Sequence, residues 1–166
     1  ETDLVYKKTF APKNVAVVGA GPAGLACATV AAGRGHRVTL FDAADEIGGQ
    51  FNYAKRIPGK EEFHETLRYF RHLLEDTRVE VKLSTPVAAA DLAGFDEVVL
   101  ATGITPRKVA FPGSDHAKVV SYVDVLSGRV TVGARAALIG AGGIGFDVAE
   151  YLTHEGHSPS LDPARW

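Results

Sequence analysis

Short runs of consecutive apolar residues near the start of the chain predict strands that are buried on both faces. Residues 15–18 are apolar without alternation, as in the interior of a parallel sheet, and residues 38–41 repeat this pattern with one threonine. Between them, residues 23–33 are rich in alanine, the strongest helix former. The order of strand, helix and strand predicts a β-α-β unit.

Other patterns follow in the middle of the chain. Residues 60–76 carry apolar side chains at every third or fourth position, which predicts an amphipathic helix. Residues 79–83 alternate between apolar and polar, which predicts a half-exposed strand. We expect residues 87–90 to pair beside that strand, and residues 95–100 to form a further buried strand.

The last third of the chain repeats the strand and helix signals more weakly. Residues 118–121 predict a short strand and residues 122–126 a single helical turn. Residues 135–139 predict another strand, which a glycine-rich turn connects to a helix over residues 146–154. Strands that alternate with helices predict an α/β protein with a mainly parallel sheet.

Composition narrows the class of protein without identifying it. The chain of 166 residues is long enough for one good core, and its 46% hydrophobic and 23% charged residues are ordinary for a soluble globular protein. A net charge of −2 gives no reason to expect nucleic acid or an acidic membrane as a partner. No apolar run approaches the roughly twenty residues of a membrane span. We expect a cytoplasmic protein, and the absence of an initial Met suggests a fragment.

Candidate catalytic and metal-binding side chains are scarce. Cys27 is the only cysteine, so the chain itself cannot form a C-x-x-C redox pair or an iron–sulfur cluster, and we expect this thiol to be a small buried residue. The six histidines are scattered without the spacing of metal ligands, and we expect them on the solvated surface. We therefore predict neither a catalytic side chain nor a metal site.

A glycine-rich turn after the first strand is the clearest chemical signal. Gly19, Gly21 and Gly24 form a G-x-G-x-x-G motif that opens the alanine-rich helix. In a dinucleotide-binding turn these glycines allow the tight turn, the approach of the pyrophosphate and the close packing of the helix, respectively. Pro22 and Ala23 fall in the first helical turn, where the free N–H groups and the helix dipole attract an anion.

Asp42 is the residue that distinguishes this dinucleotide-binding motif from an ordinary glycine turn. It follows the second strand about eighteen residues beyond Gly24, close to the spacing at which an acidic residue binds the adenosine ribose. Strand, glycine turn, helix, strand and acid together predict dinucleotide binding.

Later segments supply further candidate contacts. Gly49 and Gln50 lie in a loop at the carboxyl end of the second strand, where open α/β sheets bind ligands. Lys60 precedes the acidic first turn of its helix, and because a cation there opposes the helix dipole, a bound anion nearby would compensate for it. The backbone of Val87 can meet an adenine edge, since base recognition needs only main-chain groups.

Two more segments have small residues that allow a cofactor to approach. The sequence Ala101-Thr102-Gly103 follows the strand expected at 95–100. The second glycine-rich turn, with Gly140, Gly142 and Gly145, comes about 121 positions after the first. No hydrophobic strand with a charged end follows it, so a second nucleotide site is only half encoded.

Together these motifs closely resemble the flavin-binding region of the bacterial NADPH-dependent 2,4-dienoyl-CoA reductases, members of the old-yellow-enzyme-like NADH:flavin oxidoreductases. The resemblance covers essentially the whole chain and rests on VAVVGAGPAGLA, VTLFDAADEIGGQFN, RIPGKEEFHETLRYFRH, FDEVVLATGI, VVSYVDVL and IGAGGIGFDVAEYL.

The resemblance implies a Rossmann-like FAD/NAD(P)-binding three-layer fold. It implies a lead-in over residues 1–13, an FAD-binding domain over 14–134 and the truncated start of an NAD(P)H-binding domain over 135–166. Implied FAD contacts are Gly19, Gly21, Pro22, Ala23, Gly24, Asp42, Gly49, Gln50, Lys60, Val87, Ala101, Thr102 and Gly103, and implied NADPH contacts are Gly140, Gly142 and Gly145.

In that family, electrons pass from NADPH through FAD and a 4Fe–4S cluster to FMN, which reduces a 2,4-dienoyl-CoA in unsaturated fatty acid breakdown. The FMN barrel, the cluster cysteines and the rest of the NADPH domain have no counterpart here. The resemblance therefore implies that the partners of this chain are the remaining domains of the parent reductase, and that the chain alone is inactive on the dienoyl-CoA.

Two other functions stay open at this point. Relatives such as trimethylamine dehydrogenase keep a similar domain that holds only an adenine nucleotide, so the chain can be a non-catalytic nucleotide-binding module. A stand-alone NAD-dependent dehydrogenase would show nicotinamide-linked turnover without flavin. The sequence does not distinguish NADPH from NADH, because the strand end that normally does so is missing.

Overall fold

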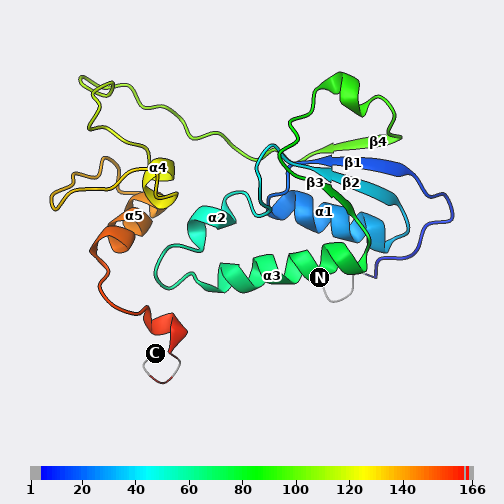
Figure 1. The fold of residues 1–166 in the computed structure, drawn as a ribbon, viewed down its shortest axis with the longest axis horizontal. Coiled ribbons are helices and arrows are strands. Elements are labelled where there is room, and N and C mark those ends of the chain that lie inside the picture. Colours follow the sequence, from blue (N-terminus) through cyan, green and yellow to red (C-terminus); the bar gives the residue numbers. More distant parts are fainter. Residues whose placement is uncertain (1–4, 163, 165–166) are drawn as a thin grey trace. The chain divides into compact units, whose positions relative to one another are not determined.

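The computed structural model describes residues 5–162 and 164, and the chain divides into two compact units (Figure 1). The first unit comprises residues up to 51 together with 65–104, and the second comprises 52–64 together with the residues from 105 onward. The expected domain boundary between residues 134 and 135 stays a prediction.

A parallel sheet of four strands forms the first unit. Its strands are β1 (Asn14–Val18), β2 (Arg37–Phe41), β3 (Glu80–Lys82) and β4 (Glu97–Leu100), in the order β3-β2-β1-β4. All three strand pairs are parallel, with Val15 opposite both Val38 and Glu97. This arrangement confirms the predicted α/β fold with a parallel sheet.

Two helices cover one face of the sheet. Helix α1 (Pro22–Gly33) and helix α3 (Glu62–Asp76), from residue 65 onward, pack their apolar side chains against β1 and β2 (Figure 1). The shared core is made of aliphatic residues that include Val15, Val17, Leu25, Ala28, Val38, Leu40, Leu67 and Leu74. Burial of these side chains is the main force that fixes the helices on the sheet.

The opposite face of the sheet is covered differently. Phe41 of β2 contacts Phe95 edge to face, with ring centroids 5.9 Å apart. Thr39 donates a hydrogen bond of 2.9 Å to the carboxylate of Glu80 on β3. The pKa of Glu80 lies below its usual value, chiefly because of this hydrogen bond and also because of the nearby ammonium group of Lys82.

The second unit contains shorter elements around its own apolar cluster. Its elements are α2 (Phe51–Ala54) from residue 52 onward, the first residues of α3, α4 (Tyr122–Leu126), α5 (Gly143–Thr153) and the 3₁₀ helix η2 (Pro159–Leu161). Ile57, Val125, Leu126 and Val148 form the buried centre of this unit. The predicted helical turn at 122–126 is confirmed, and α5 begins three residues earlier than predicted because Gly142 caps it.

Three predicted strands are wrong. Residues 87–90 are extended only at their start and continue into the 3₁₀ helix η1 (Ala89–Leu92), where the Asp91 carboxylate accepts a hydrogen bond from the Ala88 amide. Residues 118–121 and 135–139 lie outside any sheet, since the four strands of the described part of the chain all belong to the first unit. A strand needs a hydrogen-bonded neighbour, and local sequence does not supply one.

The expectation that residues 95–100 are fully buried is also wrong. Strand β4 lies at the edge of the sheet, and Val98 and Leu100 are 42% and 72% exposed. Their apolar pattern is that of an interior strand, but among the residues that the structure describes β4 pairs with β1 alone.

Candidate nucleotide-binding site

The first glycine turn lies where β1, β2 and β4 end side by side. The amide of Gly19 donates a hydrogen bond of 2.7 Å to the carbonyl of Phe41, the last residue of β2. Gly19 has a φ of +108°, and a Cβ atom at this position would overlap the carbonyl of Ala101, just beyond β4. Only glycine fits both the conformation and the space.

The start of α1 is open to an anion. A Cβ atom on Gly24 would overlap the carbonyl of Gly19, so the helix begins directly against the turn. Gly21 is the N-cap, no side chain caps the helix, and its first turn contains no acidic residue. Because the first amides of a helix have no partner within it, they point their N–H groups and the positive end of the dipole toward the turn.

The loop that follows β2 packs against this turn. The amide of Gly48 donates a hydrogen bond of 2.8 Å to the carbonyl of Ala20. Gly49 has a φ of +52°, and a Cβ atom there would lie 3.0 Å from the Cα atom of Gly21. The structure thus brings Gly49 beside Gly21, as their expected common role requires, and the adjacent Gln50 is exposed.

Asp42 connects the end of β2 to the glycine turn. Its Oδ2 atom accepts a hydrogen bond of 2.5 Å from the amide of Ala20, and its Oδ1 atom accepts one of 2.8 Å from the amide of Ala44. Each carboxylate oxygen has a second lone pair, so these bonds leave Asp42 able to accept hydrogen bonds from ribose hydroxyls.

A cavity of about 280 Å³ opens between these elements. Four residues predicted from sequence line it, namely Gly19, Asp42, Val87 and Thr102. Four others were not predicted, namely Val18, Ala43, Thr85 and Pro86. The amide of Thr85 donates a hydrogen bond of 2.8 Å to the carbonyl of Asp42, so the segment after β3 forms one wall of the cavity.

The signal that could have found the missed residues is topological. Thr85 and Pro86 follow β3, which pairs with β2 in parallel, so both strands deliver their next residues to the same edge of the sheet. Thr85 and Pro86 can therefore be predicted as lining residues only when the order of the strands in the sheet is known.

Several predicted residues lie outside this cavity's lining. Pro22, Ala23 and Gly24 are in the first turn of α1, while Ala101 and Gly103 flank Thr102. Lys60, Gly140, Gly142 and Gly145 belong to the second unit. There, the ammonium group of Lys60 lies 2.7 Å from both carboxylate oxygens of Asp147 in α5, so the anion that accompanies this lysine in the structure is Asp147.

The second glycine turn has the same geometry as the first. Gly140 has a φ of +119°, and a Cβ atom on Gly145 would overlap the Gly140 carbonyl, as one on Gly24 would overlap that of Gly19. Gly142 is an extended N-cap without a side-chain cap, like Gly21. The turn therefore forms although no strand precedes it within the described residues of this unit.

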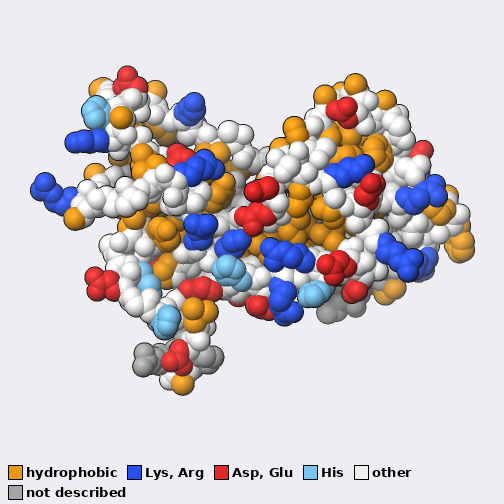
Figure 2. All heavy atoms as spheres, in the orientation of Figure 1, with side chains coloured by type: hydrophobic (Ala, Val, Ile, Leu, Met, Phe, Trp, Pro, Cys, Tyr) orange, Lys and Arg blue, Asp and Glu red, His pale blue; other side chains and the backbone are white. Residues whose placement is uncertain are grey.

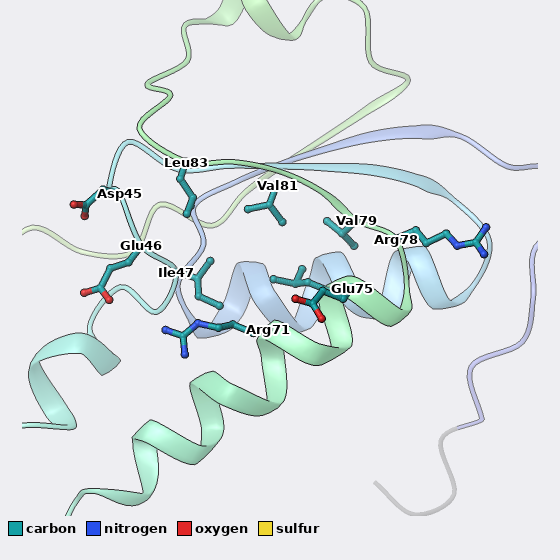
Figure 3. A pocket seen from close by; sticks show the side chains of 10 residues that line it. Asp45, Glu46, Ile47, Arg71, Glu75, Arg78, Val79, Val81 and Leu83 are labelled. Carbon is teal, nitrogen blue, oxygen red and sulfur yellow. The ribbon is translucent and has the colours of Figure 1, made fainter.

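A second, larger hollow of about 670 Å³ lies in the first unit between α3 and β3 (Figure 3). Its apolar lining consists of Ile47, Leu74, Val79, Val81 and Leu83. Charged side chains such as Arg71 and Glu75 also line it (Figure 3). In Figure 2 apolar atoms are visible above the charged side chains of α3. None of the residues predicted to bind a nucleotide lines it.

One histidine differs from the expectation of a solvated surface. His36 lies at the surface, where its Nδ1 atom accepts a hydrogen bond of 3.2 Å from the amide of Lys13, but His154 is different. The Nε2 atom of His154 is buried and has no hydrogen-bond partner within the described part of the chain, and its Nδ1 atom lies 3.6 Å from the Glu150 carboxylate. Cys27 is half-buried and packs against the core of the first unit.

The residues that the structure describes contain neither a metal-ligand cluster nor a membrane-spanning helix. Among them, no three His, Cys, Asp or Glu side chains gather in a way that would hold a metal ion. Within the same residues, every helix is too short or too polar to cross a bilayer.

Comparisons with known proteins agree with the geometry. Residues 13–161 match the family described as pyridine nucleotide-disulphide oxidoreductase. The chain is 35% identical to a metal reductase of Desulforamulus reducens, with 94% of this chain and 24% of the relative covered. It is 36% identical to a cinnamate reductase of Clostridium sporogenes, with 97% and 24% covered.

A solved structure is also similar. The structure of 2-naphthoyl-CoA reductase in complex with 2-naphthoyl-CoA matches with a TM-score of 0.86 at 34% identity, over 89% of this chain and 23% of that chain. The chain therefore spans about a quarter of the length of the relatives that it matches.

Proposed function

Because the chain belongs to the pyridine nucleotide-disulphide oxidoreductase family, we propose that its first unit binds FAD at the cavity beside the glycine turn. The observation that carries this proposal is the convergence of Gly19, Asp42 and Val87 on one cavity, next to a helix that has no side-chain cap. Glycines that leave room for a pyrophosphate and a carboxylate with free lone pairs fit the adenosine diphosphate half of the cofactor.

Residues of the chain have distinct roles in this proposal. The amides of Ala23 and Gly24 bind the pyrophosphate, Asp42 accepts the ribose hydroxyls, and the backbone of Val87 faces the adenine. Gly49 and Gln50 in the loop after β2, and Ala101, Thr102 and Gly103 after β4, contact the remainder of the cofactor. Bound FAD would supply the two-electron redox chemistry, while the protein positions it and adjusts its potential.

We propose that the second glycine turn, Gly140 to Gly145, is the pyrophosphate-binding part of an NADPH site. Support comes from its geometry, which matches that of the first turn, and from the uncapped start of α5. Reducing equivalents would pass from NADPH to FAD.

For the longer parent protein, we propose an enoyl thioester acceptor of the 2,4-dienoyl-CoA class. The resemblance at the level of motifs supports this, as does the likeness to a reductase that was solved with an aromatic CoA thioester. FMN, a 4Fe–4S cluster and the remaining domains of the parent would then complete the electron path, in the cytoplasm.

A non-catalytic adenine-nucleotide module is the competing function. The cavity favours it in one respect, since its lining accounts for the adenosine diphosphate half of FAD and not for the flavin ring. The second glycine turn favours the redox function, because a module that holds only an adenine nucleotide does not need it.

Titration of the purified 166-residue chain with FAD and, separately, with ADP distinguishes these functions. We expect saturable changes in the flavin absorption bands, which ADP reverses by competition. Saturable ADP binding without any flavin binding would instead establish the adenine-nucleotide module. NADH- or NADPH-linked turnover of an organic substrate without flavin would contradict both. We expect no reduction of a 2,4-dienoyl-CoA by the chain alone, and such turnover would overturn the assignment to one part of an electron path.

A further inference from the structure

Three hydrogen bonds connect residues 158–160 to the two residues that flank Lys60. The Gly59 amide donates to the Ser158 hydroxyl at 3.0 Å, and the hydroxyls of Ser158 and Ser160 are 3.0 Å apart. The Ser160 hydroxyl donates to the Glu61 carboxylate. All these residues belong to the second unit, and Ser158 is 6% exposed.

The direction of these bonds follows from the number of protons. A hydroxyl group has one proton. Because the O–H of Ser160 donates to the Glu61 carboxylate, Ser158 is the donor in the hydrogen bond between the two serines. The two serine hydroxyls therefore connect the Gly59 amide with the Glu61 carboxylate, on which both Ser160 and, more weakly, Ser158 act. Such a chain, with a charged group at its end, polarises each bond in the same direction.

The carboxylate at the end of the chain is held in its charged form. Desolvation raises the pKa of Glu61, but the hydrogen bonds that it accepts, first among them the one from Ser160, outweigh this effect. As a result its pKa lies below the usual value of a glutamate. A charged acceptor strengthens the hydrogen bond from Ser160.

Lys60 lies between the two anchored residues and pairs with α5. Its ammonium group contacts both carboxylate oxygens of Asp147, one helical turn beyond Gly143. The side chains of Lys60 and Asp147 are 41% and 32% exposed, so water competes for this pair unless the backbone of Lys60 is fixed. The serine chain fixes it on both sides.

We propose that Ser158 and Ser160 are positioning residues, which hold Lys60 against Asp147 and thereby fix α5 and its glycine turn. This inference rests on the proposed function in one respect, the assignment of that turn to NADPH. The positioning itself concerns only side chains of the second unit. Ser158 and Ser160 lie outside both glycine motifs, and in this proposal they influence the candidate NADPH site.

The first measurement reports on Lys60 itself. The ammonium group of Lys60 is followed by lysine side-chain NMR in isotope-labelled chain and assigned with Lys60→Arg. In Ser158→Ala and Ser160→Ala we expect its signal to move to the position found in Asp147→Asn. Ser160→Thr, which keeps the hydroxyl, should restore the wild-type signal.

Ser127→Ala is the matched control. Its hydroxyl donates to the Asp124 carbonyl in the same unit, away from the chain of hydrogen bonds, so we expect the Lys60 signal to stay unchanged. Exchange of the Gly59 amide with solvent should become at least about tenfold faster in Ser158→Ala and stay unchanged in the control. An unchanged Lys60 signal in both serine variants would overturn the proposal.

The second measurement separates this proposal from the proposed function. NADPH affinity is determined by fluorescence for the same variants, and we expect a loss of about tenfold in Ser158→Ala and Ser160→Ala. If the wild-type chain binds no NADPH, the proposed nucleotide assignment fails, while the Lys60 signal still decides the positioning role. If the wild type binds NADPH and the variants bind it equally well, the influence on the nucleotide site is refuted.

Discussion

The Asp42 carboxylate accepts a hydrogen bond of 2.5 Å from the amide of Ala20, which places the acid at the end of β2 in direct contact with the glycine turn after β1. The same side chain thus shapes the turn and faces the cavity. In the proposed site, one carboxylate would therefore stabilise the turn and also accept the ribose hydroxyls.

Replacement of Asp42 by Asn should weaken nucleotide binding. The amide keeps one acceptor oxygen but loses the charge and the second acceptor, so we expect the affinities for ADP and FAD to fall about tenfold, equivalent to about 1.4 kcal/mol. Equilibrium titration measures this change. Asp45→Asn is the control, because Asp45 is exposed and lines the other hollow. Equal affinities for the two variants would contradict a role of Asp42 in binding.

Replacement of Gly24 by Ala should destabilise the first unit. The added Cβ atom would overlap the Gly19 carbonyl, so the turn or the helix has to move, at a cost of about 1–3 kcal/mol in the free energy of unfolding. Gly33→Ala, at the other end of α1, meets no atom within 4 Å and should change stability by less than about 1 kcal/mol in the stabilising direction. Chemical denaturation compares the two, and similar stabilities would show that the turn tolerates the displacement.

The second glycine turn permits the same comparison. A Cβ atom on Gly145 would overlap the Gly140 carbonyl, whereas one on Gly143 meets nothing within 4 Å. We expect Gly145→Ala to speed amide exchange in the first turn of α5 and to abolish NADPH binding, and Gly143→Ala to leave both unchanged. Retained binding in Gly145→Ala would argue that the ligand does not use this turn.

The Thr39–Glu80 bond predicts a dependence of stability on pH. Because the pKa of Glu80 is lower in the folded chain, its contribution is complete above the unfolded pKa of about 4.3 and disappears as the pH falls through the folded value. Glu80 is largely exposed, so the contribution at pH 7 should stay below about 1 kcal/mol. Denaturation of wild type and Glu80→Gln at pH 7 and pH 3 should show a smaller difference at pH 3 than at pH 7.

A double-mutant cycle with Thr39→Val tests whether Thr39 is responsible for the stability difference between wild type and Glu80→Gln. If the hydrogen bond is responsible, Glu80→Gln should have a smaller effect in the Thr39→Val background. An equal effect in both backgrounds would attribute it to Lys82, whose ammonium group lies 3.2 Å from the Glu80 carboxylate.

Local sequence was sufficient to predict the conformation of the two glycine turns and the position of Asp42 at the end of β2. Gly19 and Gly24 contact each other across five residues, and the position of Asp42 follows from the length of one helix and one strand. The amphipathic helix at 60–76 was predicted for the same reason, since its signal is contained within the element.

Contacts between distant segments were not predictable in this way. Asp147, the partner of Lys60, is 87 residues away in the sequence, and Thr85 reaches the cavity only because β3 pairs with β2. The strand predicted at 135–139 has the composition of a strand, but pairing depends on a neighbour that local pattern does not reveal. Whether the lining residues bind FAD is a prediction that the titrations test.

The closeness of Ala101 to Gly19 has a consequence for folding. The turn after β1 is complete only when β4 has docked, and the pairing of β1 with β4 joins the most distant strands of the sheet in sequence, with Val15 opposite Glu97. Contacts of such long range cost more loop-closure entropy than the local β-α-β contacts. We therefore expect the candidate nucleotide site to form late in folding, and a ligand that binds it would protect the first unit from unfolding and proteolysis by mass action.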